Sequence, residues 1–144
     1  MSRTFTLDDA IQLARRAHEG QLDKSGRPYI AHPLRVMGRL KDEHERMAAV
    51  LHDVVEDTDV TLDDLTAVGC PPDVLEAVAA LSKRPGEAQE DYLARVLANP
   101  LALIVKRADI ADNMSDDRMG RLDRTTQERL LAKYHAALRV LDGV

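Results

Sequence analysis

The segment from Leu51 to Asp57, which reads Leu-His-Asp-Val-Val-Glu-Asp, concentrates one histidine and three carboxylates within two helical turns. His52 and Glu56 are four residues apart, as are Asp53 and Asp57, so on a helix all four groups lie along one arc of its surface. Such an arc can hold a divalent cation and a water molecule. The spacing therefore indicates metal or acid–base chemistry, although a merely solvated acidic face would produce the same pattern.

A metal site requires ligands from separate parts of the chain that fold together. The candidates are His32, His52, Asp53 and Asp109, a mixed nitrogen and oxygen set that suits Mn²⁺, Fe²⁺ or Zn²⁺. Asp109 lies in a stretch that is otherwise nearly all apolar, and an acid buried in such a stretch needs a partner. Lys106, three residues earlier, is an adequate structural partner, so a buried ion pair and a metal site both remain open.

The elements that must position these residues are helices, because the apolar spacing is helical almost throughout and no segment alternates as a strand does. We expect an all-α fold, a compact helical bundle of six to eight helices. Thr6 with Asp9, and Thr61 with Asp64, have the spacing of capping boxes at helix starts. Helices are expected over about 7–19, 33–40, 43–57, 62–69, 72–81, 88–99, 100–114 and 126–142, and the segment 115–124 is expected to be a polar loop.

Length and charge limit the classes of function. The 144 residues suit one compact domain, so we expect residues 1–144 to form a single domain. The chain carries 20 Lys and Arg against 25 Asp and Glu, a formal net charge of −5, and no basic block, which argues against a nucleic-acid partner. An anionic substrate would therefore need a local cationic pocket. The sequence gives no indication of the oligomeric state.

Two further features bear on location. The longest strongly apolar run, residues 101–105, is far too short to cross a membrane, and the first ten residues contain no apolar signal segment. The single cysteine, Cys70, has no partner in the chain and fits a reducing compartment. We therefore expect a cytoplasmic protein without a membrane partner.

Three motifs resemble those of a known family. They are Tyr-Ile-Ala-His-Pro at 29–33, Leu-His-Asp-Val-Val-Glu-Asp-Thr at 51–58 and Val-Lys-Arg-Ala-Asp-Ile-Ala-Asp-Asn-Met at 105–114. Together they resemble the HD-domain phosphohydrolases, and most of all the hydrolase domain of RelA/SpoT-type enzymes and the stand-alone small alarmone hydrolases. The segments 17–37 and 80–87 extend the resemblance over most of the chain.

This resemblance implies a metal-dependent hydrolase of the stringent response with a bundle of the HD-domain type. One divalent ion, usually Mn²⁺, would be held by His32, His52, Asp53 and Asp109. Glu56 and Asp57 would orient or deprotonate the attacking water. The implied reaction removes pyrophosphate from the 3′ position of guanosine tetra- or pentaphosphate and leaves GDP or GTP.

The resemblance also implies residues that bind this nucleotide. Lys24 and Ser25 match the substrate loop of the family, and Asn113 matches an asparagine near the nucleotide. Arg118 follows that motif closely and is assigned to phosphate by proximity alone. These four residues complete the expected site.

Asp23 departs from the family pattern, because relatives that bind guanine carry an arginine at this position, which stacks on the base. An aspartate does not stack and repels a nearby phosphate. An HD phosphohydrolase acting on an adenosine alarmone, NADPH or a nucleoside monophosphate therefore remains an alternative. So do a nucleotide-sensing module without turnover and a structural helical domain whose acidic face is only solvated.

Overall fold

The computed structural model describes residues 4–143. That range contains ten helices and, apart from one isolated bridge between Leu22 and Pro28, no β-structure. The helices are α1 (Leu7–Ala17), α2 (Ala31–Gly38), α3 (Glu43–Leu51), α4 (Val54–Asp57), α5 (Leu62–Ala67), α6 (Pro72–Leu81), α7 (Gln89–Leu97), α8 (Pro100–Asn113), α9 (Asp116–Met119) and α10 (Arg124–Asp142).

The expected all-α fold class is confirmed, and most of the expected helix starts are found where local chemistry puts them. Thr6 caps α1 and Thr61 caps α5, each through a reciprocal capping box with the acid three residues later. Pro72 and Pro100 stand at the starts of α6 and α8, where a missing backbone N–H costs little. Two helices, α4 and α9, have only four residues; the other eight in the described range match the upper expected number.

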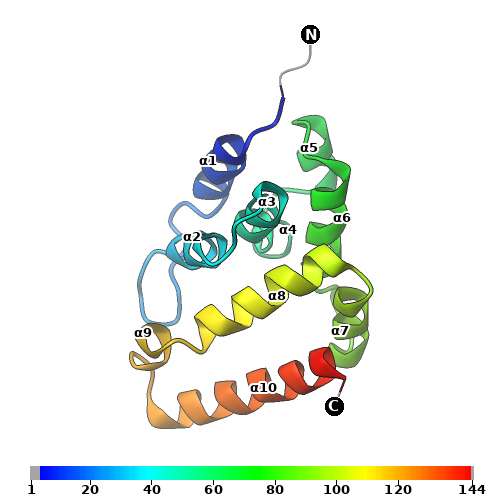
Figure 1. Cartoon of the computed structure of the whole chain (residues 1–144). Helices are drawn as coiled ribbons and strands as arrows, with labels where there is room; N and C mark the ends of the chain where they lie inside the picture. The colour runs from blue at the N-terminus through cyan, green and yellow to red at the C-terminus, as the bar shows by residue number, and fades with distance from the viewer. Residues whose placement is uncertain (1–3, 144) are drawn as a thin grey trace.

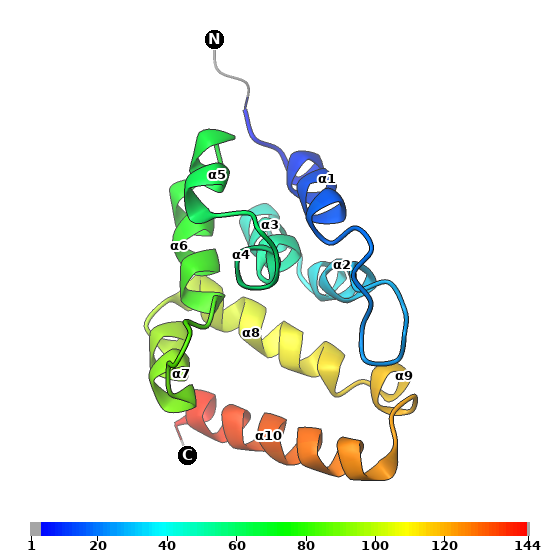
Figure 2. The same ribbon diagram turned by 180° about the vertical axis from the view of Figure 1, so that it is seen from behind.

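Two central helices, α3 and α8, organise the bundle. Helix α3 packs against α1, α2, α6 and α8, and its residues 47–51 are completely or almost completely buried. Helix α8 contacts α2, α3, α6 and α7 and crosses the middle of the molecule in Figure 1, as expected for its broad apolar surface. Helix α10 runs beside α8, with α7 near one end of the pair and α9 near the other (Figures 1 and 2).

The prediction of one continuous helix over 43–57 is wrong, because the helix is interrupted at His52 and Asp53. The imidazole Nδ1 of His52 donates to the carbonyl oxygen of Ala49, and the backbone N–H of His52 points to the same oxygen. In an uninterrupted helix that oxygen would accept the N–H of Asp53. The break therefore gives α4 its own direction, separate from α3 (Figure 2).

Two smaller differences also bear on the site. Helix α2 begins at Ala31, two residues before the expected start, so His32 lies within its first turn. The segment 115–124, expected to be a loop, contains the short helix α9, which carries Arg118. Within residues 4–143, none of the helices combines the length and apolar composition needed to span a bilayer.

Candidate metal centre and pocket

Four side chains from three parts of the chain converge beside α8. His32 comes from α2, His52 follows the end of α3, Asp53 precedes α4 and Asp109 lies on α8. Oδ1 of Asp109 is 2.7 Å from Nε2 of His32 and 3.2 Å from Nε2 of His52. Oδ2 of Asp53 is 3.1 Å from Nε2 of His52 and 4.0 Å from Nε2 of His32.

These distances fit a site for one divalent cation, because two ligands of one ion stand about 3 to 4 Å apart when each is about 2.1 Å from it. His32, His52 and Asp109 are buried, with exposed fractions of 3%, 3% and 7%. The structure thus brings together all four ligands that the family resemblance implied. The cluster of histidine and aspartate side chains could bind a metal ion.

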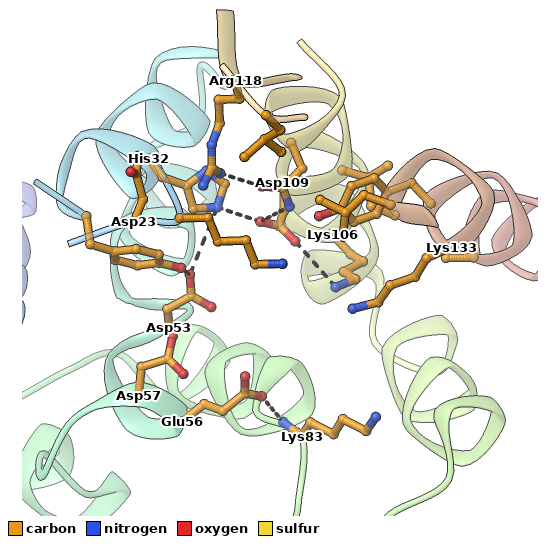
Figure 3. Close-up of a pocket in the computed structure, with 18 of the residues that line it drawn as sticks. Asp23, His32, Asp53, Glu56, Asp57, Lys83, Lys106, Asp109, Arg118 and Lys133 are labelled. Carbon is orange, nitrogen blue, oxygen red and sulfur yellow. Dashed lines mark hydrogen bonds and ion pairs between the residues drawn. The ribbon is translucent and has the colours of Figure 1, made fainter. Parts of the chain in front are cut away.

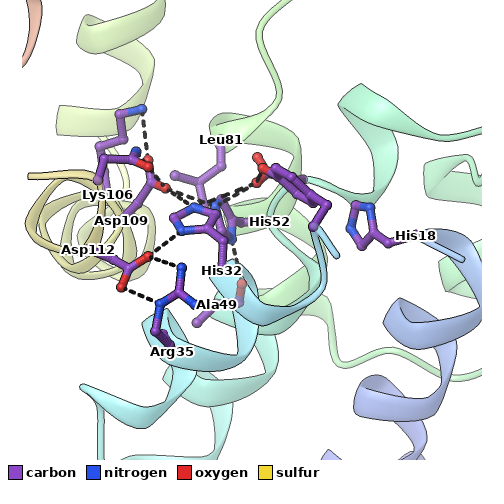
Figure 4. A network of polar contacts seen from close by, with 12 residues as sticks. His18, His32, Arg35, Ala49, His52, Leu81, Lys106, Asp109 and Asp112 are labelled. Atoms are coloured by element: carbon purple, nitrogen blue, oxygen red, sulfur yellow. Dashed lines mark hydrogen bonds and ion pairs between the residues drawn. The ribbon is translucent and has the colours of Figure 1, made fainter. Parts of the chain in front are cut away.

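The outer nitrogen of each imidazole also has a partner (Figure 4). Nδ1 of His52 donates to the carbonyl oxygen of Ala49, and Nδ1 of His32 lies 2.6 Å from Oδ2 of Asp112. With a proton on Nδ1, each imidazole can give up the proton on Nε2 and offer that lone pair to a metal. Both Nε2 atoms face the carboxylates, so the donor chemistry fits a cation.

The electrostatics of the cluster favour positive charge between the carboxylates. Burial disfavours a charged imidazole, yet Asp53 and Asp109 raise the pKa of His52 well above its usual value. Burial also disfavours an ionised Asp109, yet Lys106 and the hydrogen bonds from the two histidines hold its pKa well below the usual range. The cluster is therefore arranged to hold a cation among ionised carboxylates.

Asp53 has a partner outside this cluster. The phenolic hydroxyl of Tyr29 donates to Oδ2 of Asp53, and the ring of Tyr29 stands edge-on to the ring of His32. Burial of Tyr29, followed by the charge of Asp53, raises the tyrosine pKa far above its ordinary value, so the hydroxyl keeps its proton. Tyr29 thus orients the carboxylate of Asp53 as a hydrogen-bond donor.

Glu56 and Asp57, the two expected catalytic acids, extend the cluster outward along α4. Each offers a carboxylate oxygen within 4.8 Å of the others and of one from Asp53. Burial, with the charges of Asp53 and Glu56, raises the pKa of Asp57 to about 6. Glu56 accepts a hydrogen bond from the backbone N–H of Lys83, which fixes its direction. A carboxyl group that titrates near neutral pH beside a metal cluster can exchange protons with water.

A pocket of about 460 Å³ opens over these groups. Its wall includes nine of the ten residues singled out from the sequence; the tenth, His52, lies behind Asp53 and Asp109. In Figure 3 the acids Asp53, Glu56 and Asp57 occupy one side, while Lys106 and Lys133 face them across the space. The pocket therefore has an acidic side, formed by Asp53, Glu56 and Asp57, and lysines that face it.

Five cations line the pocket although the chain as a whole is acidic. They are Lys24, Lys83, Lys106, Lys133 and Arg118. Partial burial lowers the pKa of Lys133, and the charges of Lys106, Lys24 and Lys83 lower it further, which means that the lysines share one electrostatic field. These five residues form the local cationic pocket that an acidic protein needs in order to bind an anionic substrate.

Asp23, which departs from the family pattern, is part of the pocket wall and also organises the substrate loop. Its Oδ1 accepts hydrogen bonds of 2.9 Å from the backbone N–H and hydroxyl of Ser25 and from the backbone N–H of Arg27. Gly26 takes a φ of 82°, which completes the turn. Burial opposes ionisation, but these hydrogen bonds lower the pKa of Asp23, so it carries negative charge at neutral pH. Lys24 and Ser25 are exposed at the rim.

Asn113 and Arg118, the other expected substrate residues, contact each other. A guanidinium N–H of Arg118 donates to the amide oxygen of Asn113, whose amide nitrogen lies 3.4 Å from Oδ1 of Asp109. Nη1 of Arg118 also lies 2.8 Å from Nδ1 of His32 and 3.7 Å from Oδ2 of Asp112. These two residues line the pocket and also contact His32 and Asp109 of the candidate metal site.

The sequence interpretation missed several residues of the site. Tyr29 and Asp112 contact expected ligands, Arg35 contacts Asp112, and Lys83 and Lys133 line the pocket. Asp112 had a usable signal, because it is a second acid three residues after Asp109 in the same apolar helix. Lys83 and Lys133 had none, since each is an ordinary polar residue in its own segment.

Comparisons with known proteins agree with this geometry. A family model described as "HD domain" matches residues 10–91, a range that contains His32, His52, Asp53, Glu56 and Asp57. Asp109 follows the matched range.

Curated relatives match most of this chain with a small part of their own. A guanosine-3′,5′-bis(diphosphate) 3′-pyrophosphohydrolase of Vibrio cholerae serotype O1 is 35% identical over 142 residues, covering 85% of this chain and 20% of that protein. A GTP pyrophosphokinase of Streptomyces antibioticus is 38% identical over 138 residues, covering 85% and 16%. The bifunctional (p)ppGpp synthase/hydrolase SpoT of Escherichia coli K12 is 34% identical over 142 residues, covering 85% and 20%. The chain thus spans about a fifth, or less, of these relatives.

A solved structure supports the fold over nearly the whole length. It belongs to a protein described as a metazoan ortholog of SpoT that hydrolyzes ppGpp. The two chains share 24% sequence identity with a TM-score of 0.77, over 99% of this chain and 89% of the other. The helical arrangement described above is therefore shared with that structure.

Proposed function

Because this chain belongs to the HD-domain family, we propose that it is a metal-dependent phosphohydrolase acting on guanosine tetra- and pentaphosphate. It would release pyrophosphate from the 3′ position and leave GDP or GTP. The name of the Vibrio cholerae relative describes a 3′-pyrophosphohydrolase, and that of the Escherichia coli K12 relative a (p)ppGpp synthase/hydrolase. The observation that carries the proposal is the convergence of His32, His52, Asp53 and Asp109 at a pocket that five cations line.

The metal would be Mn²⁺, held by the Nε2 atoms of His32 and His52 and by the carboxylates of Asp53 and Asp109. Mixed imidazole and carboxylate ligands suit Mn²⁺ better than they suit thiolate-preferring ions. When bound, a divalent cation neutralises phosphate charge and lowers the pKa of a coordinated water.

Glu56 and Asp57 would handle the proton of the attacking water. With a pKa raised to about 6, Asp57 is mostly ionised just above neutral pH and still basic enough to accept a proton. The hydrogen bond from Lys83 N–H holds Glu56 beside it. In the balanced reaction, the water oxygen joins the phosphorus nearest the ribose, the bond from that phosphorus to O3′ breaks, and O3′ takes up a proton.

The nucleotide would bind through Lys24, Ser25, Asn113 and Arg118, with Lys83, Lys106 and Lys133 adding positive charge around its phosphates. A tetraphosphate nucleotide carries several negative charges, and five cations line the pocket. This arrangement favours polyphosphorylated nucleotides over neutral or singly charged ligands.

Asp23 supports a second candidate, hydrolysis of another 3′-phosphorylated nucleotide such as an adenosine alarmone or NADPH. Its carboxylate is ionised, lines the pocket and does not stack on a base as an arginine would. The loop it organises is therefore the part of the pocket where base preference would differ from that of arginine-bearing relatives.

We further propose that residues 1–144 act as one hydrolase domain, since the described helices share one hydrophobic core. A cytoplasmic location follows from the nucleotide substrate and agrees with the unpaired Cys70.

The test is pyrophosphate release by metal-stripped protein resupplied with Mn²⁺. Guanosine tetraphosphate, its adenosine counterpart and NADPH are offered side by side, with wild type, Asp109→Asn and a control, Asp63→Asn, from the exposed surface of α5. We expect wild type and Asp63→Asn to hydrolyse the guanosine substrate and Asp109→Asn to fail. Preference for another substrate would support the second candidate. Metal binding without any turnover would favour a nucleotide-sensing module.

A further inference from the structure

The imidazole of His32 is enclosed by carboxylates on both sides. Nε2 lies 2.7 Å from Oδ1 of Asp109, on the side of the metal cluster, and Nδ1 lies 2.6 Å from Oδ2 of Asp112 on the opposite side. Asp112 is almost completely buried, with 1% of its surface exposed, and is not part of the pocket wall. It is therefore a buried acid that neither the proposed metal ligands nor the proposed substrate residues explain.

Arg35 compensates the charge of this buried acid. Its Nε is 2.9 Å from Oδ1 of Asp112 and its Nη2 is 3.3 Å from Oδ2 (Figure 4). The same spacing occurs on both helices: Arg35 follows His32 by three residues on α2, and Asp112 follows Asp109 by three residues on α8. On each helix the expected ligand and the residue of the Arg35–Asp112 ion pair therefore lie on one face of that helix.

Both ring nitrogens of His32 lie within hydrogen-bond distance of a carboxylate oxygen, so a proton on Nε2 must leave when a cation binds there, and the remaining proton stays on Nδ1. A lone pair on Nδ1 at 2.6 Å from a carboxylate oxygen would be repulsive, whereas an Nδ1–H there forms a charge-assisted hydrogen bond. Nη1 of Arg118 also lies 2.8 Å from Nδ1 and could donate to it only if Nδ1 carried no proton; the anionic Oδ2 of Asp112 is closer to Nδ1, and Nη1 lies 3.7 Å from that oxygen. Asp112 therefore favours the form of His32 whose Nε2 is unprotonated.

We propose that Asp112, held by Arg35, is a positioning residue that fixes the Nδ1–H form of His32 and keeps its Nε2 available to a divalent cation. The inference rests on the proposed function, because it requires a metal at the cluster. It also distinguishes the two histidines: the anionic partner of His32 increases the electron density on its ring, whereas His52 has only the neutral carbonyl of Ala49.

The first experiment measures Mn²⁺ affinity directly, by titrating metal-stripped protein and following free Mn²⁺ by its paramagnetic resonance signal. Asp112→Asn keeps the side-chain shape and removes the charge. We expect its dissociation constant for Mn²⁺ to rise about 10- to 100-fold, as is usual when the outer partner of a metal-bound histidine is changed. Turnover should return largely at saturating Mn²⁺, because the reacting groups are intact.

The matched control is Asp142→Asn, which removes an exposed aspartate that also pairs with an arginine, 2.7 Å from Nη1 of Arg107, and that is not part of the pocket wall. It should bind Mn²⁺ as wild type does. Thermal unfolding of the metal-free proteins separates stability from affinity. If Asp112→Asn lowers the unfolding temperature yet binds Mn²⁺ with wild-type affinity, Asp112 has a structural role only and the proposal is wrong.

A second measurement needs no variant and remains informative if Asp112→Asn does not fold. Nitrogen NMR of the wild type loaded with Zn²⁺, which is diamagnetic, should show His32 with a proton on Nδ1 and none on Nε2. A proton on Nε2, or coordination through Nδ1, would overturn the proposal. Failure of the wild type to bind either metal would overturn the proposed function itself, which is a different result from equal binding by wild type and variant.

Discussion

The Nζ of Lys106 lies 3.3 Å from Oδ2 of Asp109, one helical turn further along α8, while the other oxygen of Asp109 faces the two histidines. Lys106 therefore compensates part of a buried negative charge and at the same time lines the pocket. It also lies over the ring of Tyr92, 5.2 Å from the centroid. The structural ion pair and the metal site, which the sequence left as alternatives, are compatible in this arrangement.

Lys106→Met should separate these two roles. Without the cation, metal-free protein should lose about 1–3 kcal/mol of unfolding free energy, because a hydrogen bond to a buried charge is lost. Mn²⁺ should then stabilise the variant more than the wild type, and KM for an anionic substrate should rise. Urea unfolding with and without Mn²⁺ measures the first two effects. Lys133→Met is the control, since Lys133 lines the pocket and is exposed; equal stability of both metal-free variants would contradict the prediction.

Glu56→Gln should abolish most turnover and leave metal binding intact. The amide keeps an acceptor for the N–H of Lys83 but cannot take a proton from water, so kcat should fall about 10²- to 10⁴-fold. The measurement is kcat at saturating Mn²⁺ together with Mn²⁺ affinity. Glu76→Gln, on the exposed side of α6, should retain wild-type kcat. If Glu56→Gln kept full activity, Glu56 would not be the group that accepts the proton of the water.

Binding of Mn²⁺ should raise the free energy of unfolding of the protein. At a Mn²⁺ concentration about 100 times its dissociation constant, binding adds about 2.7 kcal/mol to the unfolding free energy, which corresponds to a rise in Tm of about 5–10 °C. Asp109→Ala should show no such rise, and Asp63→Ala should show all of it. Thermal unfolding monitored by circular dichroism gives the answer; a Tm of wild type indifferent to Mn²⁺ would favour a structural role for the cluster.

Asp23→Asn should improve the binding of phosphorylated substrates. The amide oxygen can still accept the loop hydrogen bonds from Ser25 and Arg27, while a negative charge leaves the pocket wall. Removal of about 1 kcal/mol of repulsion would lower KM about fivefold with little change in kcat. Steady-state kinetics at two salt concentrations tests this, because the difference should shrink at high salt. A higher KM would mean that Asp23 itself contacts the nucleotide favourably.

The contact between Arg95 and Glu87 predicts a pH dependence of stability. Arg95 bonds both oxygens of Glu87, at 2.8 and 2.7 Å, and the carbonyl oxygens of Ala79 and Ser82. The hydrogen bonds from Arg95 lower the pKa of Glu87 to about 2. The unfolded chain binds this proton near pH 4.5, so the contribution is present above that pH and lost as pH falls towards 2.

Arg95→Gln should therefore lose stability relative to wild type at pH 7, and the gap should narrow between about pH 4.5 and 2. Part of the gap should remain at low pH, because the bonds to the two carbonyl oxygens do not titrate. Urea unfolding at several pH values measures it. Glu87→Gln, which removes the titrating group, should flatten the same part of the curve; a gap that stays constant with pH would contradict this account.

Much of the fold could be predicted because its signals are local. The capping boxes at Thr6 and Thr61 and the prolines at 72 and 100 act within one helical turn, so they mark helix starts without tertiary information. The break at His52 could not be predicted in this way. It depends on a side chain that takes the Ala49 carbonyl oxygen from the backbone, which helical periodicity does not report.

For the candidate site, too, the residue types could be predicted from the sequence, whereas their partners could not. The types and spacing of His32, His52, Asp53 and Asp109, together with the motifs around them, were enough to predict a metal site of the HD-domain kind, since ligand chemistry is a property of the residues themselves. Which groups stand behind or opposite them was decided only by tertiary structure, because the partners come from distant segments. Asp112 meets His32 across 80 residues of sequence, and Lys83 reaches the pocket from the connection between α6 and α7, whereas Lys133 reaches it from α10. The sequence thus determined which chemistry is possible, and the packing of α2, α4, α8 and α10 decided how charge and protons are arranged around it.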